Sequence, residues 1–352
     1  MNNTVFLRVN GRDWGGWTSV RISAGIDRIA RDFNVSITRQ WPGGEDVPPV
    51  KNGDSVEVLI GDDLVITGWV EALPLRYDAQ TIMTGIVGRS KTADLIDCSA
   101  SPAQHNGKNL FLIASALARP FGVDVVDAGA PAAAVIEAQP EHGETVVDCL
   151  NRLLGQAQAL AYDDERGRLV LGRPGSMKAA TALVLGENIL SCDTERSVRE
   201  RFSSYLVTGQ RPSTDDDFGE ATIAAIRQST GDAGVTRYRP HTIQQSGTAT
   251  TDSCKSRCGF EARQRAAKTL ETTYTVQGWR QGNGELWKPN QAVVVYDPLN
   301  GFDNETLVIA EVTYSQDNNG TLTEIRVGPA DAYLPEPFRP KAKKKVSEEA
   351  DF

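Results

Sequence analysis

Alternating apolar and polar positions dominate both ends of the chain and predict short β-strands there. In the segment FNVSIT, Phe33, Val35 and Ile37 share one face and the polar residues share the other. SVEVLI and LVITGWV repeat this pattern across a Gly-Asp-Asp turn, as in a hairpin. TYTVQGW, AVVVYD, LVIAEVTYS and TLTEIRVG do so after residue 270. The protein is therefore predicted to be mainly β, and residues 1–98 are predicted to form a first β-barrel domain.

A helical period replaces this alternation over residues 99–190. NLFLIASALARPF places Leu110, Ile113 and Leu117 on one helical face, and ETVVDCLNRLLGQAQA has a similar face. LAYDDERGRLVLGR then reads as a hairpin that turns at Arg166–Gly167. Residues 99–190 are predicted to form a small α/β domain, inserted after the first barrel.

The rest of the chain divides into three further parts. Residues 191–213, with the strand-like RFSSYLVTG, are grouped with residues 270–332 as a second β-barrel domain. Residues 214–269 are predicted to be a mobile excursion rich in Ser, Thr, Asp and Gly, followed by a polar helix. Residues 333–352 carry KAKKKVSEEADF and are predicted to be a disordered charged tail.

Two segments suggest an internal repeat. VKNGDSVEVLIGDDLVITGWV and WKPNQAVVVYDPLNGFDNETLVIAEVT each contain a Lys, a Gly/Asn turn, a Val-x-Val strand, a Gly/Asp-rich turn and a strand that opens Leu-Val-Ile. A Thr-led strand follows each of them, TIMTGIVG in the first case and TLTEIRVG in the second. Two explanations stay open: a duplication of one β unit, or the general likeness of all alternating hairpins.

Composition limits the classes of function. A chain of 352 residues holds two or three domains, and its net charge of -9 argues against a protein that grips nucleic acid, though not against one that lets DNA pass. Five cysteines, an odd number that is sparse over a long chain, argue against a disulfide framework. The N-terminus lacks the pattern of a signal peptide, and no run approaches the ~18 apolar residues of a membrane span. We expect a soluble chain made in a cytoplasm, without stable membrane insertion.

The search for chemistry predicts no catalytic residue, no cofactor-binding residue and no metal ligand. GIVGRSKT is not a phosphate loop, because Arg89 and Ser90 interrupt the required succession of Gly, Lys and Ser/Thr. GNGELW lacks the third glycine of a dinucleotide fingerprint. His105, His142 and His241 are scattered, and the sequence contains no HExxH.

Cys254 and Cys258 lie four residues apart on the predicted polar helix, whose expected N-cap is Asp252 or Ser253. A zinc site would need two further ligands, and none is near in sequence. The preferred interpretation is that both thiols pack against a core.

Two further groups have a functional and a structural interpretation. Asp163, Asp164 and Glu165 are interpreted as solvated residues of a hairpin end, while a carboxylate pair for glycoside cleavage stays open among 46 acidic residues. Trp279 and Trp287 flank the glycine-rich turn of GWRQGNGELWKPNQAVVVYDP. They could stack on a sugar or a base, but the preferred interpretation is a locked strand corner or an interface core.

Blocks along nearly the whole chain resemble the Mu-like tail protein P family, the baseplate hub proteins of contractile-tailed bacteriophages. The resemblance excludes the acidic stretch near 214–232 and the charged tail. Its blocks, in the family's order, include VNGRDWGGWTSVRISAGIDRIARDFNVSIT, GDSVEVLIGDDLVITGWV, GIVGRSKTADLIDCSA, GETVVDCLNRLLGQAQALAYDDERGRLVL, CGFEARQRAAKTLETTYTVQGWRQGNGELWKPNQAVVV and LVIAEVTYSQDNNGTLTEIRVGPADAYLPEP. The ordered set is specific, although no single block is.

The resemblance implies a structural hub that is not an enzyme. It implies a homotrimeric ring in the virion baseplate, whose two related barrels per subunit present a pseudo-sixfold face to the tail tube protein. A smaller domain would hold other baseplate components, and a central spike protein would attach below. DNA would pass through the channel without specific binding, and Trp279 and Trp287 would brace the start of the second barrel. The alternatives are a tail-associated peptidoglycan hydrolase and the equivalent hub of a prophage-derived contractile injection device.

Overall fold

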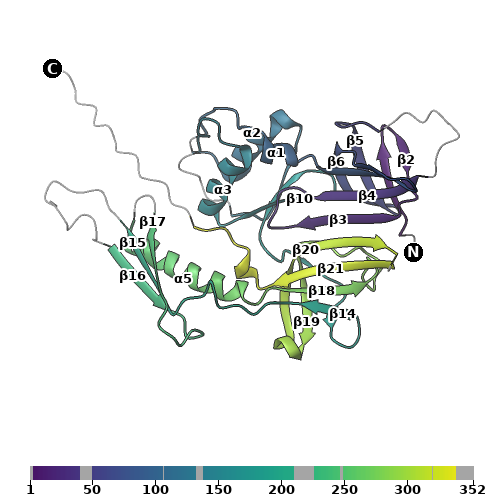
Figure 1. Cartoon of the computed structure of the whole chain (residues 1–352). Helices are drawn as coiled ribbons and strands as arrows, with labels where there is room; N and C mark the ends of the chain where they lie inside the picture. The colour runs from purple at the N-terminus through teal and green to yellow at the C-terminus, as the bar shows by residue number, and fades with distance from the viewer. Residues whose placement is uncertain are drawn as a thin grey trace, which may run out of the picture. The chain divides into compact units, whose positions relative to one another are not determined.

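The computed structural model describes residues 3–39, 50–105, 107–131, 138–209, 226–245, 249–318 and 320–337. The chain forms two compact units (Figure 1). The larger unit comprises Met1–Arg196 and Ala267–Pro335, and the smaller unit comprises Ser197–Ala266 and Glu336–Phe352. Strands far outnumber helices in the described residues, so the expected mainly β fold with few helices is confirmed.

Strands from both ends of the chain build the larger unit. The N-terminal strands are β1 (Val5–Val9), β2 (Arg12–Trp14), β3 (Ser19–Gly25), β4 (Asp32–Arg39), β5 (Ser55–Ile60), β6 (Asp63–Ala72), β7 (Leu75–Tyr77) and β8 (Ile82–Ser90). The later strands are β12 (Met177–Lys178), β13 (Leu183–Val184), β14 (Ile189–Asp193), β18 (Thr272–Gln277), β19 (Gln291–Asp297), β20 (Phe302–Asp317) and β21 (Gly320–Gly328). The short 3₁₀ helices η2 (Pro298–Asn300) and η3 (Ala330–Ala332) accompany them. The strands predicted from alternation are confirmed.

Within the described residues these fifteen strands form one sheet, whose main path runs β14-β18-β21-β20-β3-β4-β8-β6-β5-β1-β2. The antiparallel pair β3–β20, from Gly25 opposite Glu311 to Val20 opposite Gln316, joins the N-terminal strands to the C-terminal ones. Figure 1 shows these two strands side by side at the middle of the unit.

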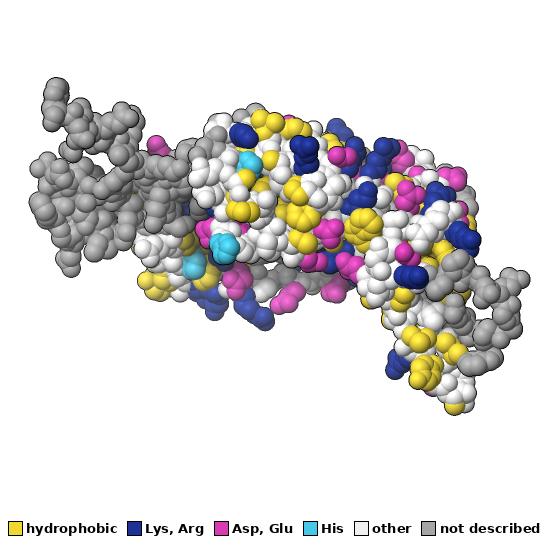
Figure 2. Space-filling model, turned by 90° about the horizontal axis from the view of Figure 1, so that it is seen from above, with side chains coloured by type: hydrophobic (Ala, Val, Ile, Leu, Met, Phe, Trp, Pro, Cys, Tyr) yellow, Lys and Arg dark blue, Asp and Glu magenta, His cyan; other side chains and the backbone are white. Residues whose placement is uncertain are grey.

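One hydrophobic cluster extends across that junction. It contains Leu7, Ile22 and Phe33 from the N-terminal strands and Tyr314 and Ile325 from the C-terminal ones, all buried. The alternation in sequence produces this cluster, because successive side chains of a strand point to opposite faces. On the face that Figure 2 shows, the remaining exposed hydrophobic side chains lie in small groups among acidic and basic ones.

The sheet contains the same arrangement twice. We call β3, β4, β8, β6 and β5 the N-terminal half-sheet, and β14, β18, β21, β20 and β19 the C-terminal half-sheet; the strands of each are adjacent in that order and all pairs are antiparallel.

Both half-sheets also carry a β-bulge at the same place. In the first, Val70 lies opposite Gly88 and Ala72 opposite Val87, so that Glu71 has no partner in the register. In the second, the pairs are Ile309–Val327 and Glu311–Arg326, which leaves out Ala310. General likeness between hairpins does not reproduce a five-strand order with its bulge, so the structure favours the internal repeat.

A small α/β layer separates the two half-sheets in sequence. It contains α1 (Ala93–Asp97), α2 (Leu110–Ala118), η1 (Arg119–Phe121), β9 (Val125–Ala128), α3 (Val146–Ala157), β10 (Leu160–Asp163) and β11 (Leu169–Gly172). The strands form a separate sheet in the order β10-β11-β9. Asn109 and Thr145 cap α2 and α3 by accepting hydrogen bonds from backbone N–H groups three residues later. The predicted helices and hairpin are confirmed.

The smaller unit consists of β15 (Ser204–Gly209), β16 (Ile226–Gly231), β17 (Pro240–Gln245) and the helix α5 (Thr251–Lys268). β15 lies between β16 and β17, which corrects its expected place in the second barrel. The physical reason is that the apolar face of β15 is buried against α5, where Val207 packs with Cys254 and Cys258.

The predicted excursion is also corrected, because residues 226–231 and 240–245 form strands of this sheet. Residues 214–225 and 246–248 of the predicted excursion lie outside the described residues, and so do residues 338–352, which are most of the predicted disordered tail. The helix begins earlier than expected. Thr250 precedes it, and the Thr250 hydroxyl accepts from the backbone N–H of Ser253 at 3.1 Å.

Candidate functional site

The tryptophans of the glycine-rich turn lie inside the core. Trp279 and Trp287 are 0% and 2% exposed. The Nε1–H group of Trp279 donates to the carbonyl oxygens of Ser315 (3.1 Å) and Leu322 (3.0 Å), which belong to β20 and β21. The hydroxyl of Tyr314 donates to the carbonyl oxygen of Trp287. Rings buried to this degree cannot stack on a ligand, so the interpretation as a locked strand corner is confirmed.

Arg280, between the two tryptophans, connects this turn to the N-terminal half-sheet. Its guanidinium donates to Asp63 Oδ2 at 2.6 Å and to the carbonyl oxygen of Ile60 at 3.2 Å, in the turn between β5 and β6. It also donates to Asn3 Oδ1 at 3.0 Å. These bonds fasten the two half-sheets at a second place, away from the β3–β20 pair.

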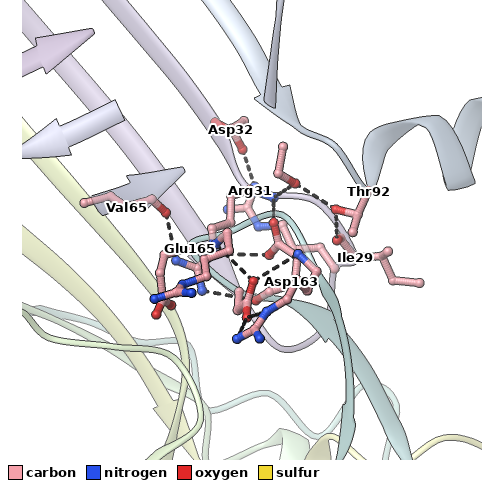
Figure 3. Close-up of polar contacts among 12 residues, drawn as sticks. Ile29, Arg31, Asp32, Val65, Thr92, Asp163 and Glu165 are labelled. Carbon is pink, nitrogen blue, oxygen red and sulfur yellow. Dashed lines mark hydrogen bonds and ion pairs between the residues drawn. The ribbon is translucent and has the colours of Figure 1, made fainter. Parts of the chain in front are cut away.

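A buried polar junction attaches the α/β layer to the sheet (Figure 3). Arg31, in the turn between β3 and β4, donates from Nε to Asp163 Oδ1 at 3.2 Å and from its backbone nitrogen to Asp163 Oδ2 at 3.0 Å. Its Nη1 and Nη2 groups donate to the carbonyl oxygens of Val65 and Asp163 at 3.0 and 3.1 Å. The guanidinium thus joins β6 to the end of β10.

Two hydroxyls continue this junction. Ser90 accepts from the backbone nitrogen of Arg31 at 3.2 Å and lies 2.7 Å from the hydroxyl of Thr92. Thr92 donates to the carbonyl oxygen of Ile29 at 2.7 Å. Ser90 and Thr92 belong to the segment GIVGRSKT, which does not match a phosphate loop. Their hydroxyls instead form hydrogen bonds with buried backbone groups of Arg31 and Ile29.

The charged pair of the junction is almost withdrawn from water. The side chains of Arg31 and Asp163 are 10% and 1% exposed. Burial raises the pKa of Asp163 above its ordinary value, while the guanidinium and the hydrogen bonds from Ser90 and Arg31 oppose that rise. Removing one partner of such a pair leaves a buried charge uncompensated, which makes the junction sensitive to mutation.

The interpretation of the hairpin carboxylates as solvated is wrong for two of the three. Asp163 is 1% exposed and Asp164 9% exposed, while Glu165 is half-buried. The oxygens of Asp164 accept from the backbone nitrogens of Arg166 and Arg168 and from the Arg168 side chain. No local pattern signals this burial, because it depends on a hairpin end lying against strands about 100 residues away in sequence.

The remaining sequence candidates have separate surroundings. His105 is buried, His142 is exposed, and His241 stacks on Phe202 in the smaller unit. Arg89 pairs with Glu71 and Asp97 near the surface. In the described ranges no group of three or more His, Cys, Asp or Glu side chains could hold a metal ion.

Cys254 and Cys258 are buried beneath the small sheet, as the preferred interpretation expected. The thiol of Cys258 donates to the carbonyl oxygen of Gln228 at 3.0 Å. Of the helices that the structure describes, none has the length and apolar character to cross a bilayer.

Fold and junctions together define a mainly β protein with a repeated sheet, whose buried polar groups join structural elements to one another. Family models match most of this chain in order. Residues 4–90 match the Mu phage baseplate assembly protein GpP-like N-terminal domain, residues 92–173 the second domain of the baseplate hub protein gp44-like family, and residues 250–336 the fourth domain of Mu phage baseplate assembly protein GpP.

Individual relatives agree with these models. The chain is 33% identical over 343 residues to the baseplate hub protein gp44 of Escherichia phage Mu, covering 95% of this chain and 90% of that one. It belongs to the family of Mu phage baseplate hub proteins gp44/GpP, and the resemblance predicted from the sequence is confirmed. This family is structural and generally non-enzymatic, and the chain is a component of a Mu-like contractile phage tail.

Solved structures show the same fold. The 43 kDa tail protein of prophage MuSo2 from Shewanella oneidensis is 32% identical with a TM-score of 0.84, covering 94% of this chain and 99% of that one. The tail protein from Neisseria meningitidis MC58 is 22% identical with a TM-score of 0.80, covering 96% and 99%. The c3393 protein of E. coli, a type VI secretion component, shares the fold at 11% identity, with a TM-score of 0.55 and coverage of 96% and 79%.

Proposed function

We propose that this hub protein forms a homotrimeric ring that adapts the sixfold tail tube to a threefold central spike and encloses the channel for DNA. The observation that carries the proposal is the repeated half-sheet, with its shared strand order and shared bulge. Three chains with two half-sheets each would present six near-equivalent β units, which is the number that a sixfold tube requires. Each half-sheet would then form one of the two related barrels.

The contacts within the chain support this proposal, because they hold its structural elements rigidly together, as a protein that transmits force requires. The β3–β20 pair, the shared core and the Arg280 bonds hold the two half-sheets in a fixed register. The Arg31–Asp163 junction holds the α/β layer on the first of them. In this proposal the half-sheets face the tube protein, and the α/β layer and the smaller unit contact other baseplate components and the spike protein.

The proposed domain division keeps most of the boundaries expected from sequence. Residues 1–98 form the first β domain, residues 270–332 form most of the second, and the α/β domain begins at residue 99. Two amendments are needed. We end the α/β domain at Gly172 and place β12, β13 and β14 in the second β domain, because β12 and β13 pair with β19 and β14 pairs with β18. We place β15 (Ser204–Gly209) with β16, β17 and α5 in the smaller unit. In this division, residues 197–266 of the smaller unit are inserted between β14 and β18.

The proposed channel passes DNA without binding it. Each chain carries a net charge of -9, so that three chains carry -27 together. Such a ring offers little of the clustered positive charge that displaces counterions from DNA. We expect no gel shift of duplex DNA at low micromolar protein near physiological salt. A shift that weakens steeply with added salt would contradict this part of the proposal.

Electron microscopy of the purified protein tests the proposed ring. Rotationally resolved class averages should show a closed particle with an open centre and six similar lobes on one face. Compact particles without a centre would contradict it. Zymography on cell-wall gels addresses the hydrolase alternative: the proposal expects no clearing, and clearing by purified protein would support that alternative.

A further inference from the structure

The two half-sheets correspond residue by residue, because their strand registers are the same. Val35 lies opposite Ile86 in the first, and Tyr274 lies opposite Ile325 in the second. The shared bulge fixes which residues are equivalent: the pair Val70–Gly88 beside the first bulge corresponds to the pair Ile309–Val327 beside the second. Counting from the bulge, Val35 and Tyr274 occupy equivalent positions, and so do the strands β4 and β18.

This correspondence extends to the outer strands. Val20 of β3 lies opposite Val35, and Cys192 of β14 lies opposite Tyr274, so β14 is the equivalent of β3. Along β8, the strand β6 is continued by β7, and Tyr77 lies opposite Ile82. Along β21, the strand β20 continues without a break.

On the C-terminal side, Gln316 of β20 lies opposite Thr321. Counted from the bulge, Tyr77 and Gln316 are therefore equivalent residues. The long strand formed by β6 and β7 is thus the equivalent of β20, and its β7 part corresponds to the part of β20 that pairs with β3.

One of the two expected strand pairs is missing within a single chain. Among the strands that the structure describes, β3 pairs with β20, but their equivalents β14 and β7 each pair with one other strand and lie at edges of the sheet; β14 has, besides, one isolated bridge from Ile189 to Leu185. The exposure of these strands differs accordingly. Val20 and Ile22 of β3 are buried, whereas Leu190 of β14 is 57% exposed, and Leu75 and Tyr77 of β7 are 62% and 74% exposed. Open edges with apolar side chains favour pairing with another chain.

We infer that β14 of one copy pairs antiparallel with β7 of the next copy, repeating between chains the β3–β20 pair made within each chain. This inference rests on the proposed ring and names the surface that closes it. The contact is heterologous, since each chain offers β14 on one side and β7 on the other, so successive copies generate a ring and not a twofold dimer.

The register of the internal pair fixes the register between chains. Val20 opposite Gln316 gives Cys192 opposite Tyr77, and Arg21 opposite Ser315 gives Asp193 opposite Arg76. The second pair brings opposite charges together, and in the described part of the chain neither side chain forms an ion pair within its own chain. Opposite charges across antiparallel strands stabilise the pair, and like charges destabilise it.

Charge reversal tests this surface. D193R alone and R76D alone should each raise the protein concentration at which half of the trimer dissociates by about tenfold, since each places like charges at every contact of the ring. D193R combined with R76D should restore the original value. R12D is the matched control, because Arg12 is an exposed residue of β2, at the other end of the sheet. Mass photometry over a dilution series measures all four variants.

A disulfide reports the register directly. Tyr77→Cys should form a bond with Cys192 of the neighbouring copy on oxidation, giving a covalent trimer on a non-reducing gel. Adding Cys192→Ser should abolish it, and Leu299→Cys, at an exposed site in η2, should give no trimer.

The outcomes separate the two proposals. A trimer that ignores both single reversals and forms no disulfide would overturn the β14–β7 surface and leave the ring intact. A chain that stays monomeric at micromolar concentration in its unaltered form would contradict the ring itself. A larger effect of R12D than of D193R would place the contact at β2 and would also overturn the inference.

Discussion

The N-terminal and C-terminal half-sheets share a frame but differ in how their first two strands are connected. A short turn, residues 26–31, joins β3 to β4, whereas residues 197–266, the larger part of the smaller unit, lie between β14 and β18. Their side chains also differ, since Phe33 and Val35 correspond to Thr272 and Tyr274. The repeat thus retains strand order and bulge, which belong to the backbone, and leaves residue identity free.

The half-sheets are also fastened by different chemistry. The N-terminal one is held to the α/β layer by the buried pair of Arg31 and Asp163. The C-terminal one is closed by the Trp279 side chain and by the hydroxyl of Tyr274, which donates to Asp297 Oδ2 at 2.8 Å. This difference predicts that the two halves respond differently to mutation and to pH.

The largest effect is expected at the buried ion pair. Arg31→Met leaves the Asp163 carboxylate buried without its counter-charge and should lower the free energy of unfolding by about 3–5 kcal/mol. Urea denaturation measures it. Arg166→Met, an exposed arginine on the same hairpin, should change stability by less than about 0.5 kcal/mol. Equal effects of the two substitutions would show that the junction does not fasten the layer.

A double variant sharpens this result. Arg31→Met combined with Asp163→Leu removes both charges and should recover much of the loss, because an apolar pair needs no desolvation. A double variant as unstable as Arg31→Met would mean that packing at this position, and not the uncompensated charge, dominates.

A smaller loss is expected at the tryptophan corner. Trp279→Phe removes the indole N–H, leaves two carbonyl oxygens without that donor and opens space in the core, so unfolding should become easier by about 2 kcal/mol. Thermal denaturation followed by circular dichroism measures it. Trp14→Phe, at a partly buried residue of the edge strand β2, should cost less than half as much, because the indole N–H of Trp14 makes no hydrogen bond that the substitution would remove. If both cost the same, the corner is not a special closure of the C-terminal half.

The smallest effect concerns pH. Burial opposes ionisation of Asp297, but the hydrogen bonds from Asn300 and Tyr274 hold its pKa below the ordinary value. A lowered pKa in the folded state stabilises the fold above pH ~4, and this contribution is lost as pH falls through the folded pKa. Asp297→Asn should therefore cost about 1 kcal/mol at pH 6 and progressively less toward pH 3. A difference that does not depend on pH would contradict this assignment.

Sequence patterns predicted the helices and strands better than they predicted which strands pair and which side chains meet. The helices Leu110–Ala118 and Val146–Ala157 follow from local spacing, as do the strands after residue 270. The sheet to which the strand Ser204–Gly209 belongs was not predicted correctly, because alternation identifies a strand but not the strands that pair with it. The burial of Asp163 could not be predicted from local sequence for the same reason, since its partner Arg31 is 132 residues away in sequence.

The repeat lies between these two cases. Its hairpins were visible in the sequence, but only the paired registers show that five strands and a bulge recur. Val70 and Ile309 occupy the same position at that bulge. Register is a relation between distant segments, so a single sequence cannot display it directly.

The mass of the unaltered protein in solution tests the central claim most directly. Light scattering at micromolar concentration should give three chains of 38.1 kDa, about 114 kDa together, over a tenfold range of dilution. A constant mass of one chain over that range would contradict the ring that the repeated half-sheet supports.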